Sequence, residues 1–281
     1  MALCLDTHCH LDANEFANYL DAVIQRAAQV GVHGVLIPAV QAKDFEAVAS
    51  LAHQAALHLP ATCYTLGIHP IYTPWAKESD MDILRKAVRQ AMSDPRFVGI
   101  GEIGLDYFLP ELDAHQQAFF FEAQLNLAQE FKLPVILHVR RSQDAILKAL
   151  RTRKISGGIA HAFNGSFQQA EQFIQLNFAM GFGGAMTFSR ALQIRRLATE
   201  LPIEHIVLET DAPDIPPAWL NSQVNRRNEP GELPQISSIL AELRATLITQ
   251  TQSQCAQNAL RVIPRWADLV SAQAPYLVHQ A

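Results

Sequence analysis

Short apolar runs alternate with longer amphipathic segments along almost the whole chain, and this alternation constrains the fold most. Eight such runs occur, at residues 3–8, 33–38, 62–67, 97–102, 134–138, 157–161, 178–183 and 205–210. Segments with the apolar spacing of helices lie at 12–30, 43–57, 80–92, 113–132, 142–151, 167–175, 189–201, 232–249 and 252–262. A strand–helix–strand order implies parallel strands, and eight repeats of about 35 residues favour a closed barrel over an open sheet. We therefore expect an α/β fold, a (β/α)8 TIM-type barrel that forms a single domain over residues 1–281.

Composition and charge limit the classes of partner. The 281 residues are 49% hydrophobic and 17% charged, which allows one large core. The formal net charge is −5, so no global positive field attracts a polyanion, and nucleic-acid binding would need a local site. No signal-peptide pattern and no apolar run of about 20 residues is evident. The four cysteines follow no Cys-x-x-Cys spacing, and a chain of this size hardly needs disulfides, so reduced thiols are favoured over disulfide pairs. The composition predicts a cytoplasmic protein that binds no membrane, and it points to no protein partner.

Two histidines follow the first apolar run directly. In the segment Asp6-Thr7-His8-Cys9-His10, the histidines are two residues apart. Alternate residues of a strand point to one side, so both imidazoles could face one metal ion while Cys9 points into packing. The pair could equally be two surface residues at a strand end, so its meaning depends on the rest of the chain.

Later apolar runs also end in side chains that bind metals. Glu102, His138, His161 and Asp211 follow the fourth, fifth, sixth and eighth runs. In a parallel barrel, the carboxyl ends of all strands converge on one site. Imidazole nitrogens and carboxylate oxygens suit Zn²⁺, Mn²⁺ or a similar divalent ion. The six residues His8, His10, Glu102, His138, His161 and Asp211 suffice for two ions with Glu102 between them, an arrangement that can promote a phosphoryl displacement.

The segments that carry these residues resemble the TatD family of metal-dependent hydrolases, often described as deoxyribonucleases. The similar segments are Asp6-Thr-His8-Cys-His10, Gly67-Ile-His69-Pro70, Gly99-Ile-Gly-Glu102-Ile-Gly-Leu-Asp106, Leu133-Pro-Val-Ile-Leu-His138, His161-Ala-Phe-Asn-Gly165 and Leu208-Glu-Thr-Asp211-Ala-Pro213. They extend over nearly the whole chain and are specific in combination.

The resemblance implies which of these residues would hold each metal ion and which would take part in catalysis. His8, His10 and Asp211 would hold one metal ion, His138 and His161 the second, and Glu102 would touch both. It also implies hydrolysis of phosphodiester bonds in DNA by a metal-activated water, with Asp211 as the base and Glu102 as the other catalytic residue. We expect two divalent ions per chain, Zn²⁺, Mn²⁺ or Mg²⁺, and the removal of nucleotides from DNA ends, single-stranded ends in particular.

Other residues near strand ends are candidates for supporting roles. His69 follows the third run, and we expect it to contact substrate, because other residues already fill both metal sites; a structural role is the alternative. Asp106, four residues past Glu102, would order a loop. Glu209, two residues before Asp211, would support the metal site from behind.

Arginines and aromatic residues in the loops suggest how substrate could bind. Arg140 follows His138 closely and could form paired hydrogen bonds to a phosphate; the alternative is a salt bridge to Asp144 or Glu111. Rings in the loops could stack on a base or could pack inward. These rings are Trp75, Phe108 and Trp219.

Two alternative functions stay open. Related barrels with the same rim of histidines and carboxylates hydrolyse amides and esters, so an amidohydrolase-like reaction on a small ester or amide is the first alternative. Arginines gathered at the mouth, Arg140, Arg141 and Arg226, would favour phosphate over a neutral substrate. A scaffold with a structural metal is disfavoured, because four protein ligands usually close such a site.

Overall fold

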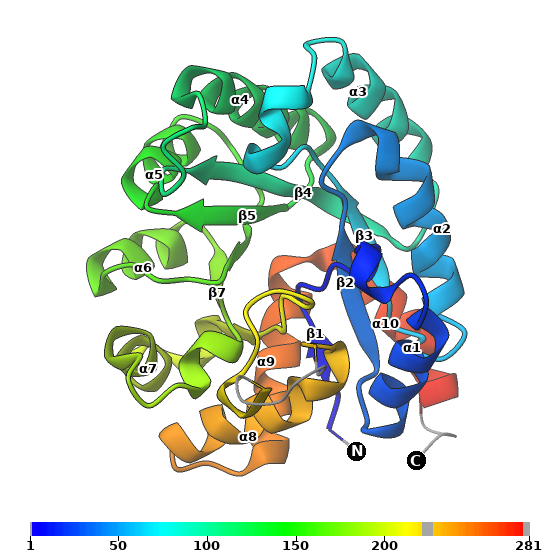
Figure 1. Ribbon diagram of the computed structural model, residues 1–281, viewed down its shortest axis with the longest axis vertical. Helices are drawn as coiled ribbons and strands as arrows, with labels where there is room; N and C mark the ends of the chain where they lie inside the picture. The colour runs from blue at the N-terminus through cyan, green and yellow to red at the C-terminus, as the bar shows by residue number, and fades with distance from the viewer. Residues whose placement is uncertain (1, 221–226, 278–281) are drawn as a thin grey trace.

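The computed structural model describes residues 2–220 and 227–277, and its eight strands form a parallel barrel surrounded by helices (Figure 1). The strands follow one another around the barrel in chain order, each parallel to the next. They are β1 (Leu5–Asp6), β2 (Gly34–Pro38), β3 (Cys63–Leu66), β4 (Phe97–Asp106), β5 (Val135–Arg140), β6 (Gly158–His161), β7 (Phe178–Phe182) and β8 (Ile206–Leu208). The predicted (β/α)8 TIM-type barrel is confirmed.

The barrel closes where β8 meets β1, through hydrogen bonds just beyond the ends of these short strands. The Thr7 N–H donates to the Leu208 carbonyl at 3.0 Å, and the Asp211 N–H donates to the His8 carbonyl at 2.9 Å. The His10 N–H then donates to the Ala212 carbonyl at 2.8 Å. Residues 8 and 10 are thereby held beside residue 211, at the opening of the barrel.

Ten α-helices among the described residues surround the strands. They are α1 (Leu20–Gln29), α2 (Phe45–Ala55), α3 (Asp80–Ala91), α4 (Ala114–Phe131), α5 (Gln143–Arg151), α6 (Phe167–Gln175), α7 (Leu192–Glu200), α8 (Leu233–Leu243), α9 (Ile248–Val262) and α10 (Pro264–Leu277). Local caps fix some of their starts: the Asp113 side chain accepts hydrogen bonds from the first turn of α4, and Ser166 with Gln169 forms a capping box on α6. No helix within the described ranges is long and apolar enough to cross a bilayer.

Several elements differ from the sequence-based expectation. The helix expected over 232–249 ends at Leu243, and α9 begins at Ile248 rather than at 252. The fourth strand runs to Asp106 rather than ending at 102, because its register with β5 shifts between Ile100 and Ile103 and pairing then resumes. The first helix begins at Leu20, since the residues before it form the 3₁₀ helix η1 (Asn14–Phe16) and a turn. Helix α10 was not predicted at all.

The core has an inner and an outer layer. Leu36 of β2 belongs to the inner cluster with apolar residues of the other strands, whereas Val35 and Ile37 belong to the outer cluster between strands and helices. Trp266 at the start of α10 joins the inner cluster, is fully buried, and donates its indole N–H to the Ala61 carbonyl at 2.7 Å. Helices α9 and α10 thus cover the amino-terminal end of the barrel and leave the carboxyl-terminal end open.

Candidate metal centre

The open end of the barrel holds a cavity of about 1490 Å³, lined by residues at or beyond the carboxyl ends of all eight strands. Its floor includes His10, Glu102, His138, His161 and Asp211. The volume exceeds the roughly 300–1,000 Å³ of sites for drug-sized ligands. A long or bulky substrate therefore has room here.

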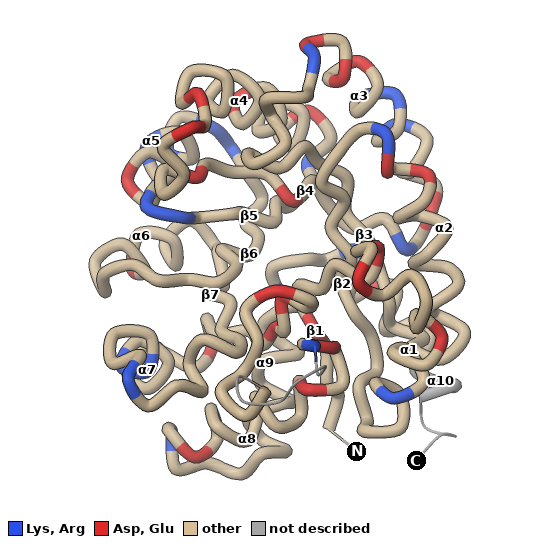
Figure 2. Tube along the Cα trace, in the orientation of Figure 1, with Lys and Arg blue, Asp and Glu red and all other residues tan. Residues whose placement is uncertain are grey.

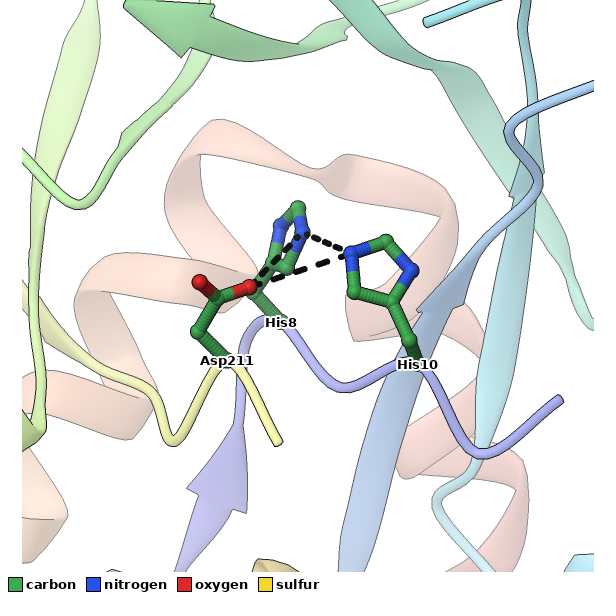
Figure 3. A group of neighbouring side chains, drawn as sticks. All are labelled: His8, His10 and Asp211. Atoms are coloured by element: carbon green, nitrogen blue, oxygen red, sulfur yellow. Dashed lines mark hydrogen bonds and ion pairs between the residues drawn. The ribbon is translucent and has the colours of Figure 1, made fainter. Parts of the chain in front are cut away.

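The seam between β1 and β8 brings three donors together (Figure 3). His8 Nε2 and His10 Nε2 are 3.2 Å apart, and they lie 3.6 and 3.8 Å from Asp211 Oδ1. His8 is fully buried, whereas His10 is partly exposed toward the cavity. Alternation along the strand end explains this convergence, and Cys9 between them is buried on the other side, as expected.

Glu102 lies at the centre of the site. Its Oε2 is 3.0 Å from His8 Nε2 and 3.4 Å from His10 Nε2. Its Oε1 is 3.0 Å from His138 Nδ1 and 3.7 Å from His161 Nε2. One buried carboxylate thus touches all four histidines of the predicted ligand set.

His138 contacts a second carboxylate, that of Asp106. His138 Nε2 lies 3.0 Å from Asp106 Oδ2, while Asp106 Oδ1 accepts hydrogen bonds from the N–H groups of Phe108 and Leu109. Asp106 is the last residue of β4 and is buried, so the structure gives it a contact with the site as well as the expected ordering of the following loop. The extension of β4 past Glu102 is what brings Asp106 there.

His161 is held from two sides. Its ring stacks on that of His8 with centroids 3.8 Å apart, and its Nδ1 lies 3.4 Å from Glu209 Oε1. Glu209 is buried and accepts a hydrogen bond from the Ala162 N–H at 2.6 Å, so it lies behind His161, the position expected for it. Within the described residues, no group of three neighbouring donors contains both His138 and His161, whose ring centroids are 6.2 Å apart.

His69 lies against Glu102 rather than in the open cavity. Its Nδ1 accepts a hydrogen bond from the Ile71 N–H at 3.1 Å, and its Nε2 is 3.1 Å from Glu102 Oε1. Burial lowers the pKa of His69 to about 4, so the ring is neutral and its one N–H, on Nε2, donates to Glu102. Both nitrogens are therefore in use, which fits a residue that orients Glu102.

Asp6 is a buried residue to which the sequence assigned no role. Its carboxylate accepts hydrogen bonds from the His8 N–H at 3.2 Å, the Thr210 N–H at 2.9 Å and the Thr210 hydroxyl at 2.6 Å. Burial raises its pKa to about 7. Asp6 thus ties the residues before Asp211 to those before His8, and its place in the Asp6-Thr-His8 motif was the signal available in the sequence.

The buried imidazoles and carboxylates shift one another's pKa. Burial lowers the pKa of His8 well below its usual range, and the neighbouring His161 adds to this effect. Burial acts in the same direction on His161, but Asp211 and Glu209 raise its pKa to about 10. Burial would raise the pKa of Glu102, yet the imidazoles of His69 and His8 hold it well below its usual range. Glu102 is therefore ionised and surrounded by groups that compensate a negative charge.

These side chains fit a divalent metal ion. A tetrahedral ion with nitrogen and oxygen ligands at about 2.0–2.2 Å keeps its ligand atoms roughly 3.3–3.6 Å apart. The separations between His8 Nε2, His10 Nε2, Glu102 Oε2 and Asp211 Oδ1 given above, 3.0 to 3.8 Å, are of this size. Three donor groups arise in this way: His8, His10 and Asp211; His8, Glu102 and His161; His69, Glu102 and His138.

Among the described residues, the arginine and the aromatic residues predicted to bind substrate differ in their exposure and contacts. Arg140 is half exposed, and its guanidinium lies 3.6 Å from Asp106 rather than against Asp144 or Glu111. Trp75 is exposed, whereas Trp219 donates its indole N–H to Glu232. Arg226 lies outside the described residues.

A (β/α)8 barrel with histidines and carboxylates gathered at the carboxyl ends of its strands defines the class of metal-dependent barrel hydrolases. The family described as TatD related DNase matches residues 5–264 of the chain. The chain belongs to this family and is a metal-dependent hydrolase.

Individual relatives agree with this assignment. The uncharacterized metal-dependent hydrolase YjjV of Escherichia coli K12 is 37% identical over 241 residues, which cover 85% of this chain and 90% of the relative. The 3'-5' ssDNA/RNA exonuclease TatD of Erwinia tasmaniensis is 34% identical, over 92% of this chain and 98% of the relative. The crystal structure of Escherichia coli YjjV aligns with a TM-score of 0.85 and 34% identity, over 93% of this chain and 98% of that one.

Proposed function

We propose that this enzyme removes nucleotides from single-stranded ends of DNA by hydrolysis of the terminal phosphodiester bond. The observation that carries the proposal is the convergence of His10, Glu102 and Asp211 on the floor of a large open cavity, with buried His8 in contact with them, in a DNase family. A relative of similar length is named as a 3'-5' ssDNA/RNA exonuclease. This name supports a single-stranded substrate and removal of nucleotides in the 3'-to-5' direction.

We assign His8, His10 and Asp211 to one divalent ion and His138 and His161 to a second, with Glu102 in contact with both. Zn²⁺, Mn²⁺ and Mg²⁺ are the candidate ions. When bound, such ions make a water molecule more acidic and offset the charge of the phosphate. The ring centroids of His138 and His161 lie 6.2 Å apart, and one nitrogen of each ring lies within 3.7 Å of Glu102 Oε1.

The protein's own groups have distinct tasks in the reaction. Asp211 points into the cavity and accepts the proton of the attacking water, while burial raises its pKa to about 6. Glu102 stays ionised and fixes the histidines around it. Arg140 binds a phosphate oxygen of the substrate, and His69 keeps the Glu102 carboxylate oriented; a substrate contact at His69 stays a prediction.

The cytoplasm is the compartment we propose. All four cysteines are free and buried in the described structure, which suits a reducing compartment. Fractionation of cells that express the protein at its native level tests this placement.

Asp211→Asn tests the proposed reaction directly. Wild-type protein should release mononucleotides from a single-stranded oligonucleotide labelled at either end, with Mg²⁺, Mn²⁺ or Zn²⁺. Loss of the base should lower kcat by about 10²–10⁴-fold without a large change in melting temperature. Absence of release with all three ions, together with hydrolysis of a small amide or ester such as p-nitrophenyl acetate, would move the protein to the amidohydrolase-like alternative.

A further inference from the structure

The charges around the mouth are unevenly distributed. Among the described residues that line the cavity outside its floor, Arg140 and Arg141 lie at the end of β5, whereas the carboxylates of Asp12, Glu15, Asp44 and Asp214, with Lys43 beside Asp44, follow β1, β2 and β8. Figure 2 shows Lys and Arg where β5 leads into α5, and Asp and Glu across the barrel where the chain follows β1. Burial and these four carboxylates together raise the pKa of Tyr72, which lies on the acidic side. A polyanion that leaves the mouth therefore meets repulsion on one side and attraction on the other.

The two arginines share one aromatic residue. The guanidinium carbons of Arg140 and Arg141 lie 3.9 and 4.6 Å from the centre of the Phe108 ring, which is 43% exposed. Stacking on a ring restricts a guanidinium while its N–H edges stay available for phosphate oxygens. Phe108 itself is anchored, because its N–H donates to Asp106 at 2.9 Å.

Arg141 is positioned by the backbone as well. Its φ of 56° lies in the left-handed region, and the next residue, Ser142, is buried and donates its hydroxyl to the Leu105 carbonyl at 2.6 Å. Across the described ranges, no carboxylate oxygen comes within 4.0 Å of the Arg141 guanidinium. The Arg141 guanidinium is thus restricted in position at the mouth, and no neighbouring carboxylate among the described residues neutralises its charge.

Arg140 connects this cluster to the floor of the cavity. Its guanidinium lies 3.6 Å from Asp106 Oδ2, the same oxygen that is 3.0 Å from His138 Nε2. A strand whose terminal phosphodiester reaches the metal centre can therefore place its next phosphates at Arg140 and then at Arg141.

We propose that the single strand runs from the metal centre over the loop between β5 and α5, with successive phosphates bound by Arg140 and Arg141 and with Phe108 holding both guanidinium groups. This path rests on the proposed function and adds Arg141 and Phe108 to the substrate site. The opposite route runs along the groove beside exposed Trp75 and Lys43. This route passes the acidic side of the mouth, so the strand does not follow it.

Binding without hydrolysis tests the path. A fluorescent twelve-nucleotide oligothymidylate is titrated with each variant in the presence of a chelator, at two salt concentrations, and binding is followed by anisotropy. Arg141→Ala should weaken binding about tenfold. It should also reduce the slope of the logarithm of the binding constant against the logarithm of the salt concentration by about 0.7, which is the contribution of one phosphate on a single strand. Phe108→Ala should also weaken binding, and Phe108→Tyr should restore it, because only the ring is required.

Two controls lie on the acidic side of the mouth. Lys43→Ala removes the same charge as Arg141→Ala, and Trp75→Ala removes an exposed ring; neither should change the affinity. A loss with Lys43→Ala or Trp75→Ala as large as that with Arg141→Ala, an unchanged affinity with Arg141→Ala, or no binding by the wild type would overturn the path.

Hydrolysis assays separate failure of the path from failure of the proposed function. The KM for the twelve-nucleotide substrate relative to that for dithymidine monophosphate should rise in Arg141→Ala, because the shorter substrate has no phosphate beyond the scissile one and so cannot reach Arg141. If the wild type binds through Arg141 but cleaves neither substrate nor bis(p-nitrophenyl) phosphate, the proposed reaction fails and the path stands. If it cleaves all three while the ratio is unchanged in Arg141→Ala, the path fails and the reaction stands.

Discussion

At the scale of single residues, the site is a set of histidines held from behind by carboxylates. Glu209 lies behind His161 and Asp106 behind His138, and each places an acidic oxygen near the ring nitrogen that does not face Glu102. Such partners fix the orientation of a ligating imidazole and raise its basicity. They are therefore expected to control metal affinity without binding the ion.

Asp106→Asn tests this role. The amide can no longer compensate charge on His138, so we expect the affinity for Mn²⁺ to fall by about 10–100-fold. Isothermal titration with Mn²⁺ measures the loss, and Glu111→Gln on the exposed loop beyond provides a control that should bind as the wild type does. Equal affinity in all three proteins would show that Asp106 serves the loop alone.

The ligand candidates could be predicted from the sequence, whereas their supporting contacts could not. His8, His10, His138 and Asp211 each follow an apolar run, and a parallel barrel brings such positions to one end. Asp106 was placed in a loop, because a register shift inside β4 has no signal in the apolar pattern. The role of Asp6 depends on a contact with Thr210, which is distant in sequence, so local spacing could not reveal it.

At the scale of elements, β4 has the greatest influence on the site, since Glu102 and Asp106 both extend from it. The shifted register is accompanied by Gly104, whose φ of 153° is a conformation that residues with a side chain rarely adopt. A Cβ at this position would also collide with the His138 carbonyl oxygen. Close approach of β4 and β5 therefore requires a glycine here.

Gly104→Ala should separate these two strands. Strain and overpacking together predict a loss of at least about 1–3 kcal/mol in the free energy of unfolding. Metal affinity should fall as well, because His138 and Glu102 move apart. Urea unfolding measures the first effect, and Gly231→Ala is the matched control, since a Cβ there meets nothing closer than 3.8 Å.

A second group of contacts joins α2, β3 and the start of β4 through Asp94. Its carboxylate accepts hydrogen bonds from the Arg96 N–H and the Tyr64 hydroxyl, each at 2.9 Å, and lies 2.9 Å from His53 Nε2. Burial would raise the pKa of Asp94, but these partners hold it below its usual range. A lowered pKa means that the ionised group stabilises the fold above the unfolded value of about 3.9 and that this contribution is lost as the pH falls through the folded value.

Asp94→Asn should therefore destabilise the protein at pH 7 and have a smaller effect at pH 3. Urea midpoints at the two pH values, compared with those of the wild type, give the difference. Glu171→Gln, on the exposed face of α6, should show no such dependence on pH. A deficit at pH 3 as large as that at pH 7 would rule out the ionised carboxylate as the cause.

At the scale of the whole molecule, the two ends of the barrel have separate tasks. The carboxyl-terminal end carries the metal site, whereas the amino-terminal end is covered by α9 and α10. The barrel was predictable because eight strands alternate with helices, but α10 was not, since its role depends on Trp266 filling the base of the barrel. The apolar pattern of a helix that follows the last strand–helix repeat does not indicate where on the barrel the helix will pack.

Trp266→Ala should show that the two ends are independent. Truncation of this fully buried ring is expected to cost about 3–5 kcal/mol in the free energy of unfolding. Mn²⁺ affinity measured well below the melting temperature should match that of the wild type, because α10 packs at the amino-terminal end of the barrel, where Arg265 donates to the carbonyl of Phe97 at the start of β4. Loss of metal binding in a folded variant would contradict this separation.

The seam between β1 and β8 has a consequence for synthesis of the protein. Residues 8 and 10 leave the ribosome first among the proposed metal ligands, yet the carboxylate at position 211 that completes their donor group is translated some two hundred residues later. A nascent chain consequently carries an unfinished cation site through most of translation. Hydrolysis that depends on this donor group is therefore expected only after the eighth strand has emerged and docked against the first.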